Sequence, residues 1–281
     1  MNGMLVMQSD FGLSDGAVAA MCGVAMSVDE NLKIFHLTHD IPPFDTFEAS
    51  YRLMQAVPYW PAGTVFVTVV DPGVGSKRKS IVAKTKPGQY IVTPDNGSLS
   101  HISRAVGIES VRVISEKNRR QNSELSYTFH GRDIFSYTAA RLASGKISYE
   151  EIGEEADVRD LVLFAGLHPE VSETKIRGVI ETLDVRFGSL WTNISREDFA
   201  AMNVSDGENL DVSVYHDHTR LYHSFVPFKH TFAEVEIGEP LLYINSMDYI
   251  GLALNQGNFA RAYNIGTREP WYIVLEKIIR K

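Results

Sequence analysis

The two halves of this 281-residue sequence carry different hydrophobic patterns, and this difference limits the possible folds more than any other feature. In the first half, short β-branched or aromatic runs alternate with helical patterns, as at 33–37 and 45–57. Such alternation is typical of a mainly parallel sheet covered by helices on both faces. From about residue 170 the helical signal fades, and strand-like runs such as 175–183 and 220–228 are separated by turns rich in Gly, Asp and Asn. The sequence therefore predicts an α/β domain followed by a smaller antiparallel β-domain.

The change of pattern places the domain boundary within 160–175. We assign residues 1–166 to the α/β N-terminal domain and residues 167–281 to the β-rich C-terminal domain. A chain of this length accommodates about two domains of ~100–200 residues each.

Charge and composition exclude several classes of partner. The net charge of −8 opposes broad binding to nucleic acid or to anionic membranes. No apolar run approaches the ~18 residues that a membrane-spanning helix needs. The first residues lack the pattern of a secretory signal peptide, and the single cysteine, Cys22, excludes internal disulfides and thiolate zinc clusters. We expect a cytoplasmic protein.

Polar residues follow several predicted strands of the first half, where open α/β sheets bind ligands. The most informative case is TVFVTVVDPGVGSKR, in which a buried strand ends in an acid, a glycine-containing loop and an arginine. One carboxylate at a strand end is commonplace, but several at one edge predict a site. The residues concerned are Asp10, Asp15, His39, Asp40, Asp71, Arg78, Asp95, Asn96 and His130.

These residues also have structural interpretations. Asp15 is equally well placed to cap a helix, His39 and Asp40 could form a satisfied loop pair, and DPGVG could be only a tight turn. A metal-dependent hydrolase is a second functional interpretation. However, the sequence contains no H-x-x-x-H pair, no D-x-D-x-D-G loop and no phosphate-binding or nucleophile-elbow motif. The spacing alone does not identify a reaction.

Seven motifs occur in the order found in the S-adenosylmethionine hydroxide adenosyltransferases, and the sequence resembles this family over nearly its whole length. The motifs are SDFGLSDGAVAAMCGV, LTHDIPPFD, GTVFVTVVDPGVGSKR, VTPDNGSLS, TFHGRDIF, ETLDVRFGSLWTNI and LYINSMDYIGLALNQGN. The family comprises hydrolase relatives of fluorinating and chlorinating enzymes. The resemblance implies an N-terminal α/β domain, a C-terminal β-barrel-like domain, and a trimer with substrate bound between neighbouring subunits. The sequence leaves open whether the assembly is a trimer or a hexamer.

The resemblance also implies a catalytic triad that handles water, formed by Asp71, Arg78 and His130. In the fluorinating branch a tyrosine takes the place of Asp71, and a serine that contacts halide follows the histidine. Here Gly131 follows His130, and Val74 stands where the fluorinase has a threonine. The halide-binding set is therefore absent, which places the sequence on the hydrolase side.

Substrate-binding roles are implied in the same way. Asp10 resembles the acid that binds the ribose hydroxyls, and Ser246 resembles the residue near the methionine carboxylate. Ser189 replaces an asparagine that contacts adenine in the fluorinase, and Met247 replaces an arginine near the methionine carboxylate. The other implied contacts are Asp15 and Asp184 with the ammonium group, Phe44 with ribose and methionine, and Phe187 and Phe232 with adenine.

The sequence thus predicts an S-adenosyl-L-methionine hydrolase that forms adenosine and L-methionine without a cofactor or metal. The alternatives are a non-catalytic sensor of S-adenosylmethionine or adenosine, and a chlorinase-like or metal-dependent hydrolase.

Overall fold

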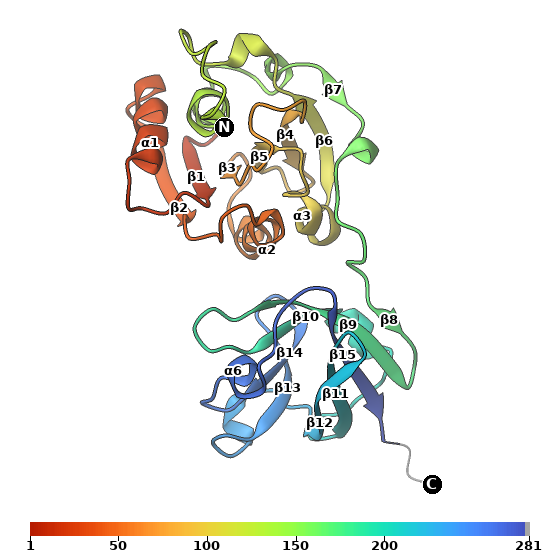
Figure 1. The fold of residues 1–281 in the computed structure, drawn as a ribbon. Helices are drawn as coiled ribbons and strands as arrows, with labels where there is room; N and C mark the ends of the chain where they lie inside the picture. Colours follow the sequence, from red (N-terminus) through yellow and green to blue (C-terminus); the bar gives the residue numbers. More distant parts are fainter. Residues whose placement is uncertain (279–281) are drawn as a thin grey trace. The chain divides into compact units, whose positions relative to one another are not determined.

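The computed structural model describes residues 1–278, and the chain forms two compact units (Figure 1). The first unit comprises Met1–Phe164, and the second begins at Ala165. Among the described residues, no helix combines the length and the hydropathy that crossing a membrane would require.

The first unit is built on a seven-stranded sheet with the order β2-β1-β3-β5-β4-β6-β7. Its strands are β1 (Met4–Ser9), β2 (Lys33–Thr38), β3 (Val65–Val69), β4 (Ser80–Thr85), β5 (Tyr90–Pro94), β6 (Ile108–Val113) and β7 (Glu155–Ala156). Its helices are α1 (Ala17–Val28), α2 (Thr46–Ala56), α3 (Ser100–Ala105) and α4 (Tyr137–Ala143). Shorter turns are η1 (Val57–Tyr59), η2 (Glu116–Asn118), the π-helical η3 (Gly131–Ser136), η4 (Glu150–Ile152) and η5 (Val158–Asp160).

The sheet is mixed, so the expectation of a mainly parallel sheet is wrong. β2, β1, β3 and β5 run parallel to one another, whereas β4 pairs antiparallel with β5 and β6, and β6 pairs antiparallel with β7. The physical reason lies in the connection between β4 and β5, in which only residues 86–89 separate the strands. A parallel pair needs a crossover of a dozen or more residues, so this short turn can only close a hairpin.

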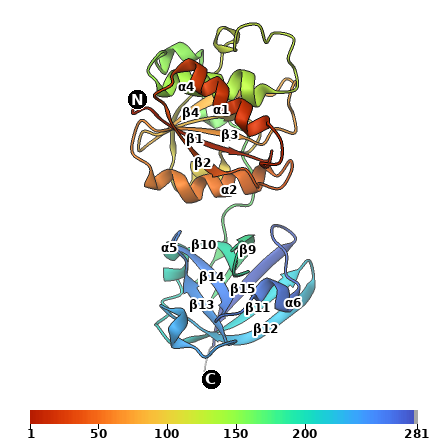
Figure 2. The same ribbon diagram turned by 90° about the vertical axis from the view of Figure 1, so that its left-hand side faces the viewer.

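Helices cover both faces of this sheet (Figure 2). α1 packs with α4 on one face, and α2 packs with α3 on the other. On the α1–α4 face, alternate residues of the central strands, such as Met7 and Val67, form a buried cluster with Met21 and Ala139. α2 begins where the sequence predicts, because the Asp45 carboxylate accepts a hydrogen bond from the Glu48 backbone N–H at 2.9 Å.

The second unit is an eight-stranded antiparallel sheet with the order β12-β11-β15-β9-β10-β14-β13, in which β8 adds to β9. Its two end strands meet at a bridge between Phe228 and Leu242, which nearly closes the sheet into a barrel. The expected antiparallel, barrel-like domain is therefore confirmed. The strands are β8 (Glu170–Val171), β9 (Lys175–Leu183), β10 (Leu190–Ser195), β11 (Asn209–His216), β12 (Thr219–Pro227), β13 (Pro240–Ile244), β14 (Tyr249–Leu254) and β15 (Trp271–Lys277). Short helices are α5 (Arg196–Ala200), η6 (Phe232–Glu234) and α6 (Phe259–Tyr263).

Candidate functional site

A pocket of about 280 Å³ opens in the first unit, next to the carboxyl ends of β1 and β3. This edge is where an open α/β sheet binds ligands, as the sequence predicts. The pocket is lined by Asp10, Phe11, Pro43, Phe44, Val69, Asp71, Val74, Thr128, Phe129, His130 and Gly131.

The mixed sheet explains why Asp71 and Arg78 meet at this edge. β3 ends at Val69, and Asp71 follows at its carboxyl end. β5 is parallel to β3, and β4 is antiparallel to β5, so β4 begins at the same edge where β3 ends. The chain therefore leaves the sheet and returns to it within a single short loop, which carries an acid at its start and a base at its end.

Asp71 and Arg78 form a two-pronged ion pair. The Arg78 Nε donates to Asp71 Oδ1 at 2.8 Å, and its Nη2 donates to Asp71 Oδ2. The remaining nitrogen, Nη1, donates to the Ser80 hydroxyl at 2.6 Å, and the guanidinium lies 5.1 Å from the ring centre of Phe135. The two side chains are only 6% and 11% exposed. Each charge is thus compensated, and removing either partner would leave the other buried and unpaired.

His130 completes this group from a distant part of the chain. It immediately precedes the π-helical turn η3, and its Nδ1 lies 3.1 Å from Arg78 Nη2. Because a guanidinium can only donate, Nδ1 must accept, and the proton of the neutral ring is on Nε2. Burial lowers the pKa of His130, and the nearby Arg78 charge lowers it further. Within the described part of the chain, Nε2 has no hydrogen-bond partner.

A side chain at the position of Gly131 would be crowded by its neighbours next to this histidine. A Cβ atom at this position would lie 3.2 Å from both Phe11 Cε2 and Val69 Cγ1. Contacts this short require the neighbours to move, and Val69 is held in the central strand β3.

Asp10 directly follows β1, and its carboxylate holds an unusual backbone conformation in place. Asp10 Oδ2 accepts a hydrogen bond from the Phe44 N–H at 2.8 Å. Phe44 has a φ of +67°, which is rare for an aromatic residue, and its side chain is 72% exposed. The second oxygen, Oδ1, has no hydrogen-bond partner among residues 1–278 and is available to a ligand.

Asp15 does not line the pocket. Its Oδ1 accepts a hydrogen bond from the Ala17 N–H at 2.9 Å, at the first residue of α1. Asp15 therefore lies just before α1, whose N-cap is Gly16 and has no side-chain capping hydrogen bond.

A second pocket, of about 1040 Å³, lies in the second unit. It brings together five residues that the sequence analysis singles out, namely Asp184, Phe187, Ser189, Phe232 and Ser246. The other lining residues are Arg186, Trp191, Ala233, Tyr243, Asn245, Leu254, Asn255, Gln256, Gly257, Asn258 and Arg261.

The predicted residues of this pocket differ in exposure. Asp184 Oδ1 accepts hydrogen bonds from the N–H groups of Arg186 and Phe187, both at 3.0 Å, and so shapes the turn after β9. The Phe187 ring is 69% exposed, whereas Ser189 is buried. Phe232 lies against the Tyr243 ring with 4.9 Å between centres. The pocket thus presents aromatic faces beside a carboxylate.

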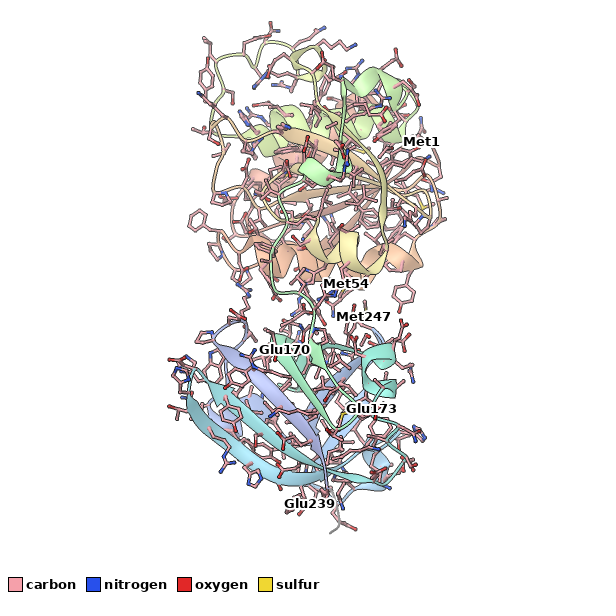
Figure 3. All side chains as sticks on the ribbon, turned by 90° about the vertical axis from the view of Figure 1, so that its right-hand side faces the viewer. Met1, Met54, Glu170, Glu173, Glu239 and Met247 are labelled. Carbon is pink, nitrogen blue, oxygen red and sulfur yellow. The ribbon has the colours of Figure 1, made fainter. Side chains whose placement is uncertain are left out.

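The sequence analysis missed several lining residues and included one that lies elsewhere. Trp191 and Tyr243, joined by a 3.0 Å hydrogen bond from the indole N–H to the hydroxyl, lie within motifs of the resemblance but received no role. Arg186 and Arg261 add two guanidinium groups. Met247 lies in the turn between β13 and β14, outside the lining, and its N–H donates to Asn245 Oδ1 at 2.9 Å (Figure 3).

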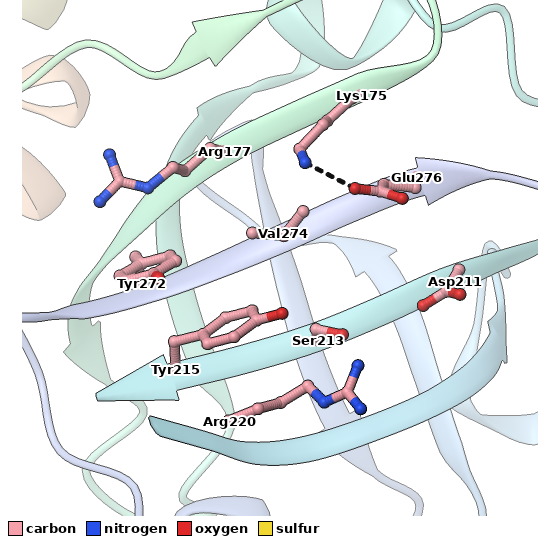
Figure 4. Close-up of a pocket in the computed structure, with 9 residues that line it drawn as sticks. All are labelled: Lys175, Arg177, Asp211, Ser213, Tyr215, Arg220, Tyr272, Val274 and Glu276. Atoms are coloured by element: carbon pink, nitrogen blue, oxygen red, sulfur yellow. Dashed lines mark ion pairs between the residues drawn. The ribbon is translucent and has the colours of Figure 1, made fainter. Parts of the chain in front are cut away.

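A third groove, of about 320 Å³, crosses β9, β15, β11 and β12 (Figure 4). Its polar groups largely satisfy one another. Lys175 pairs with Glu276 at 2.7 Å, Tyr215 stacks on Tyr272 at 4.9 Å, and the Arg177 guanidinium lies 4.1 Å from the Tyr272 ring centre. No residue singled out as a substrate or catalytic residue lines this groove. Elsewhere in residues 1–278, no group of three His, Cys, Asp or Glu side chains is arranged to hold a metal ion.

Comparisons with known proteins agree with this division into units. The family model described as SAM hydroxide adenosyltransferase N-terminal domain matches residues 5–153, and the corresponding C-terminal domain model matches residues 178–272. An (R)-S-adenosyl-L-methionine hydrolase from Methanocaldococcus jannaschii is 36% identical over 199 residues, covering 69% of this chain and 68% of the relative. A fluorinase from Actinopolyspora mzabensis is 27% identical, covering 93% of this chain and 94% of the relative.

A solved structure shares the fold of nearly the whole chain. The crystal structure of an uncharacterized conserved protein from Thermotoga maritima superposes with a TM-score of 0.88 at 30% identity, covering 98% of this chain and all of that one. The matched domain models together span most of both units, in the expected order. The chain therefore belongs to the S-adenosylmethionine hydroxide adenosyltransferase family.

Proposed function

We propose that this protein hydrolyses S-adenosyl-L-methionine to adenosine and L-methionine by attack of water or hydroxide on the ribose 5′ carbon. The observation that carries the proposal is the neutral His130, held by the buried Arg78–Asp71 pair at the wall of the first pocket. The relatives named (R)-S-adenosyl-L-methionine hydrolase support it.

The chemistry explains why such a site suffices. Methionine leaves the 5′ carbon as a neutral thioether, so the leaving group needs no general acid. As hydroxide approaches a sulfonium, opposite charges cancel in the transition state. A dry pocket that solvates separated charges poorly therefore favours the reaction. The protein has to bind the nucleophile, orient it and exclude other water.

Each member of the triad then has a distinct role. Arg78 stabilises the negative charge of a bound hydroxide, and Asp71 fixes the guanidinium in position. His130 donates its Nε2 proton to the attacking oxygen as a hydrogen bond, because its Nδ1 is already occupied by Arg78. This geometry favours an orienting role over a general-base role. When hydroxide attacks, the C–O bond forms as the C–S bond breaks, and the 5′ hydroxyl of adenosine results without further proton transfer. When neutral water attacks, the oxonium that forms is a strong acid and loses one of its two protons to solvent.

The two pockets supply the proposed substrate contacts. The open Oδ1 of Asp10 accepts hydrogen bonds from the ribose hydroxyls, and the exposed ring of Phe44 covers ribose and methionine. Because Met247 carries no charge and lies outside the second pocket, we assign the methionine carboxylate to Arg186 or Arg261 together with Ser246. The remaining proposed contacts are Asp184 and Asp15 with the ammonium group, and Phe187, Ser189 and Phe232 with adenine.

We further propose a trimeric assembly and a cytoplasmic location for this protein. Each pocket carries only part of the proposed substrate-binding set, which supports a trimer, or a multiple of it, that shares substrate between neighbouring subunits. The unpaired Cys22 is in keeping with the cytoplasm, where thiols stay reduced. We propose no metal, no other cofactor, and no nucleic-acid or membrane partner.

The decisive experiment incubates purified protein with S-adenosyl-L-methionine and separates the products by chromatography, with and without a chelator. Release of adenosine and methionine at the same rate in both samples is the expected result. Tight binding without turnover would instead indicate a sensor, and loss of activity with chelator would indicate a metal-dependent hydrolase.

A further inference from the structure

We propose that Ser9, His39 and His36 form a hydrogen-bonded chain that positions Asp10, with His39 as the central positioning residue. None of the three lines either pocket, and the activity readouts used below rest on the proposed function. The hydrogen–deuterium exchange measurement described below does not depend on the proposed function.

Two short hydrogen bonds define the chain. His39 Nδ1 lies 2.7 Å from the Ser9 hydroxyl, and His39 Nε2 lies 2.7 Å from His36 Nδ1. Ser9 is fully buried and His39 is 4% exposed, whereas His36, on β2, is exposed. The chain therefore runs from the surface of the first unit to the last residue of β1.

We assign the direction of these bonds so that each donor meets an acceptor. The Ser9 hydroxyl oxygen already accepts from the Phe11 N–H at 3.3 Å, so its own proton is free to donate. If Ser9 donates to Nδ1 of His39, then Nε2 carries the proton and donates to His36 Nδ1, and every group in the chain is satisfied. Burial and the neighbouring His36 lower the pKa of His39 to about 4, an effect that Asp40 partly opposes, which agrees with a neutral ring.

Two further hydrogen bonds join residues 9–12 to residues 39–44 next to the first pocket. The Gly12 N–H donates to the His39 carbonyl at 2.8 Å, and the Phe44 N–H donates to Asp10 Oδ2. The side-chain bond between Ser9 and His39 is therefore one of three ties between residues 9–12 and 39–44. Because Ser9 precedes Asp10, this tie restricts the backbone that aims the carboxylate at the ribose.

The first unit contains a matched control for this arrangement. His101 is fully buried, and its Nδ1 lies 2.9 Å from the Ser50 hydroxyl. This pair joins α3 to α2 and does not line the first pocket. Ser50→Ala therefore removes the same chemistry from a purely structural position.

The first test measures hydrogen–deuterium exchange at the Phe44 amide in the ligand-free protein. Ser9→Ala should accelerate this exchange about tenfold or more, because the Asp10–Phe44 bond loses its support, whereas Ser50→Ala should leave it unchanged. Circular dichroism establishes that both variants fold. Unchanged protection at Phe44 in a folded Ser9→Ala variant would overturn the proposal, whatever reaction the enzyme catalyses.

The second test distinguishes the contribution of His39 Nδ1 from that of His39 Nε2. Asparagine places its amide near the position of Nδ1, whereas glutamine reaches toward that of Nε2. His39→Gln and Ser9→Ala should therefore raise KM for S-adenosyl-L-methionine several-fold with little change in kcat, and His39→Asn should recover most of the loss. Equal KM values for His39→Asn and His39→Gln would contradict positioning through Ser9. If the wild-type protein releases no adenosine, the proposed function fails, and the exchange experiment still decides the positioning role.

Discussion

The two pockets differ in size, charge and burial. The pocket of the first unit is about 280 Å³ and is built around a buried ion pair and a neutral histidine. The pocket of the second unit is about 1040 Å³ and is dominated by aromatic rings, amides and partly exposed charges. A small pocket whose buried charges are paired is suited to catalysis, whereas a wide pocket lined by aromatic rings is suited to binding the substrate. Substitutions in the triad at the first pocket should therefore change kcat, and those in the second pocket should change KM.

The largest effect is expected for Arg78→Ala. The substitution removes the positive charge proposed to stabilise hydroxide and leaves Asp71 buried without its partner, so kcat should fall by about 10²–10⁴. Arg78→Lys is the matched control, because it keeps the charge but loses the two-pronged geometry, and it should retain part of the activity. Steady-state kinetics with circular dichroism as a folding control make the measurement. Wild-type kcat in a folded Arg78→Ala protein would show that the ion pair is structural.

His130→Ala should lower kcat by about 10²-fold, since one oriented hydrogen-bond donor to the attacking oxygen is lost. The pH profile provides a second check. The proposed active form is the neutral imidazole, and burial and Arg78 lower its pKa, so activity should persist as pH falls through 6.5 and decline only at lower pH. A decline in kcat/KM centred at or above pH 6.5 would contradict the assigned environment.

Removing one adenine-facing ring should affect binding rather than turnover. Stacking of a base on an aromatic side chain is worth about 1–3 kcal/mol, so Phe187→Ala or Phe232→Ala should raise KM about 5- to 150-fold at nearly constant kcat. Phe225→Ala, on β12 and 58% exposed, is the control because it lines neither of the two pockets. A fall in kcat as large as that of His130→Ala would remove the distinction between the pockets.

A smaller effect is expected when the methionine carboxylate loses its proposed partner. Arg261→Gln or Arg186→Gln should raise KM for S-adenosyl-L-methionine by several-fold, because an exposed charged hydrogen bond contributes only modestly. The affinity for adenosine, measured by calorimetry, should stay the same. Arg220→Gln removes a guanidinium from the groove of Figure 4 and serves as the control. Weaker adenosine binding in the Arg261 variant would place this residue at the nucleoside instead.

No effect is expected from halide. Millimolar chloride or fluoride should yield no 5′-halogenated adenosine, since the resemblance implies a tyrosine at the position of Asp71 in the fluorinating branch, and a Cβ at Gly131 would lie only 3.2 Å from Val69 Cγ1. Gly131→Ser should not introduce the activity either. Mass spectrometry of the reaction mixture would detect 5′-halogenated adenosine. Its formation at a rate near that of hydrolysis would contradict the hydrolase proposal.

Local patterns were enough to predict individual elements. The helical pattern at 45–57 predicts α2, which is observed at Thr46–Ala56 with Asp45 as its N-cap. Strand direction was missed because burial patterns record which residues are covered and not which way a strand runs. The four-residue connection before Tyr90 was the available signal for a hairpin.

The candidate site shows the same limit. The family resemblance could suggest Asp71, Arg78 and His130 as a group, but it could not show that Arg78 occupies the Nδ1 of His130 and thereby sets its proton on Nε2. Trp191 and Tyr243 were missed because their roles depend on the way β10 and β13 face one pocket.

The short loop between Asp71 and Arg78 also has a consequence for the order in which the first pocket forms during folding. The two charges are seven positions apart, whereas His130 lies 52 positions beyond Arg78. Loops of about ten residues close within about 10–100 ns, and the entropy lost on closure rises only slowly with length. We therefore expect the charged half of the pocket to form as an early, local event. The slow step in forming the complete pocket is then the docking of the π-helical turn, which places His130 next to the Arg78 guanidinium.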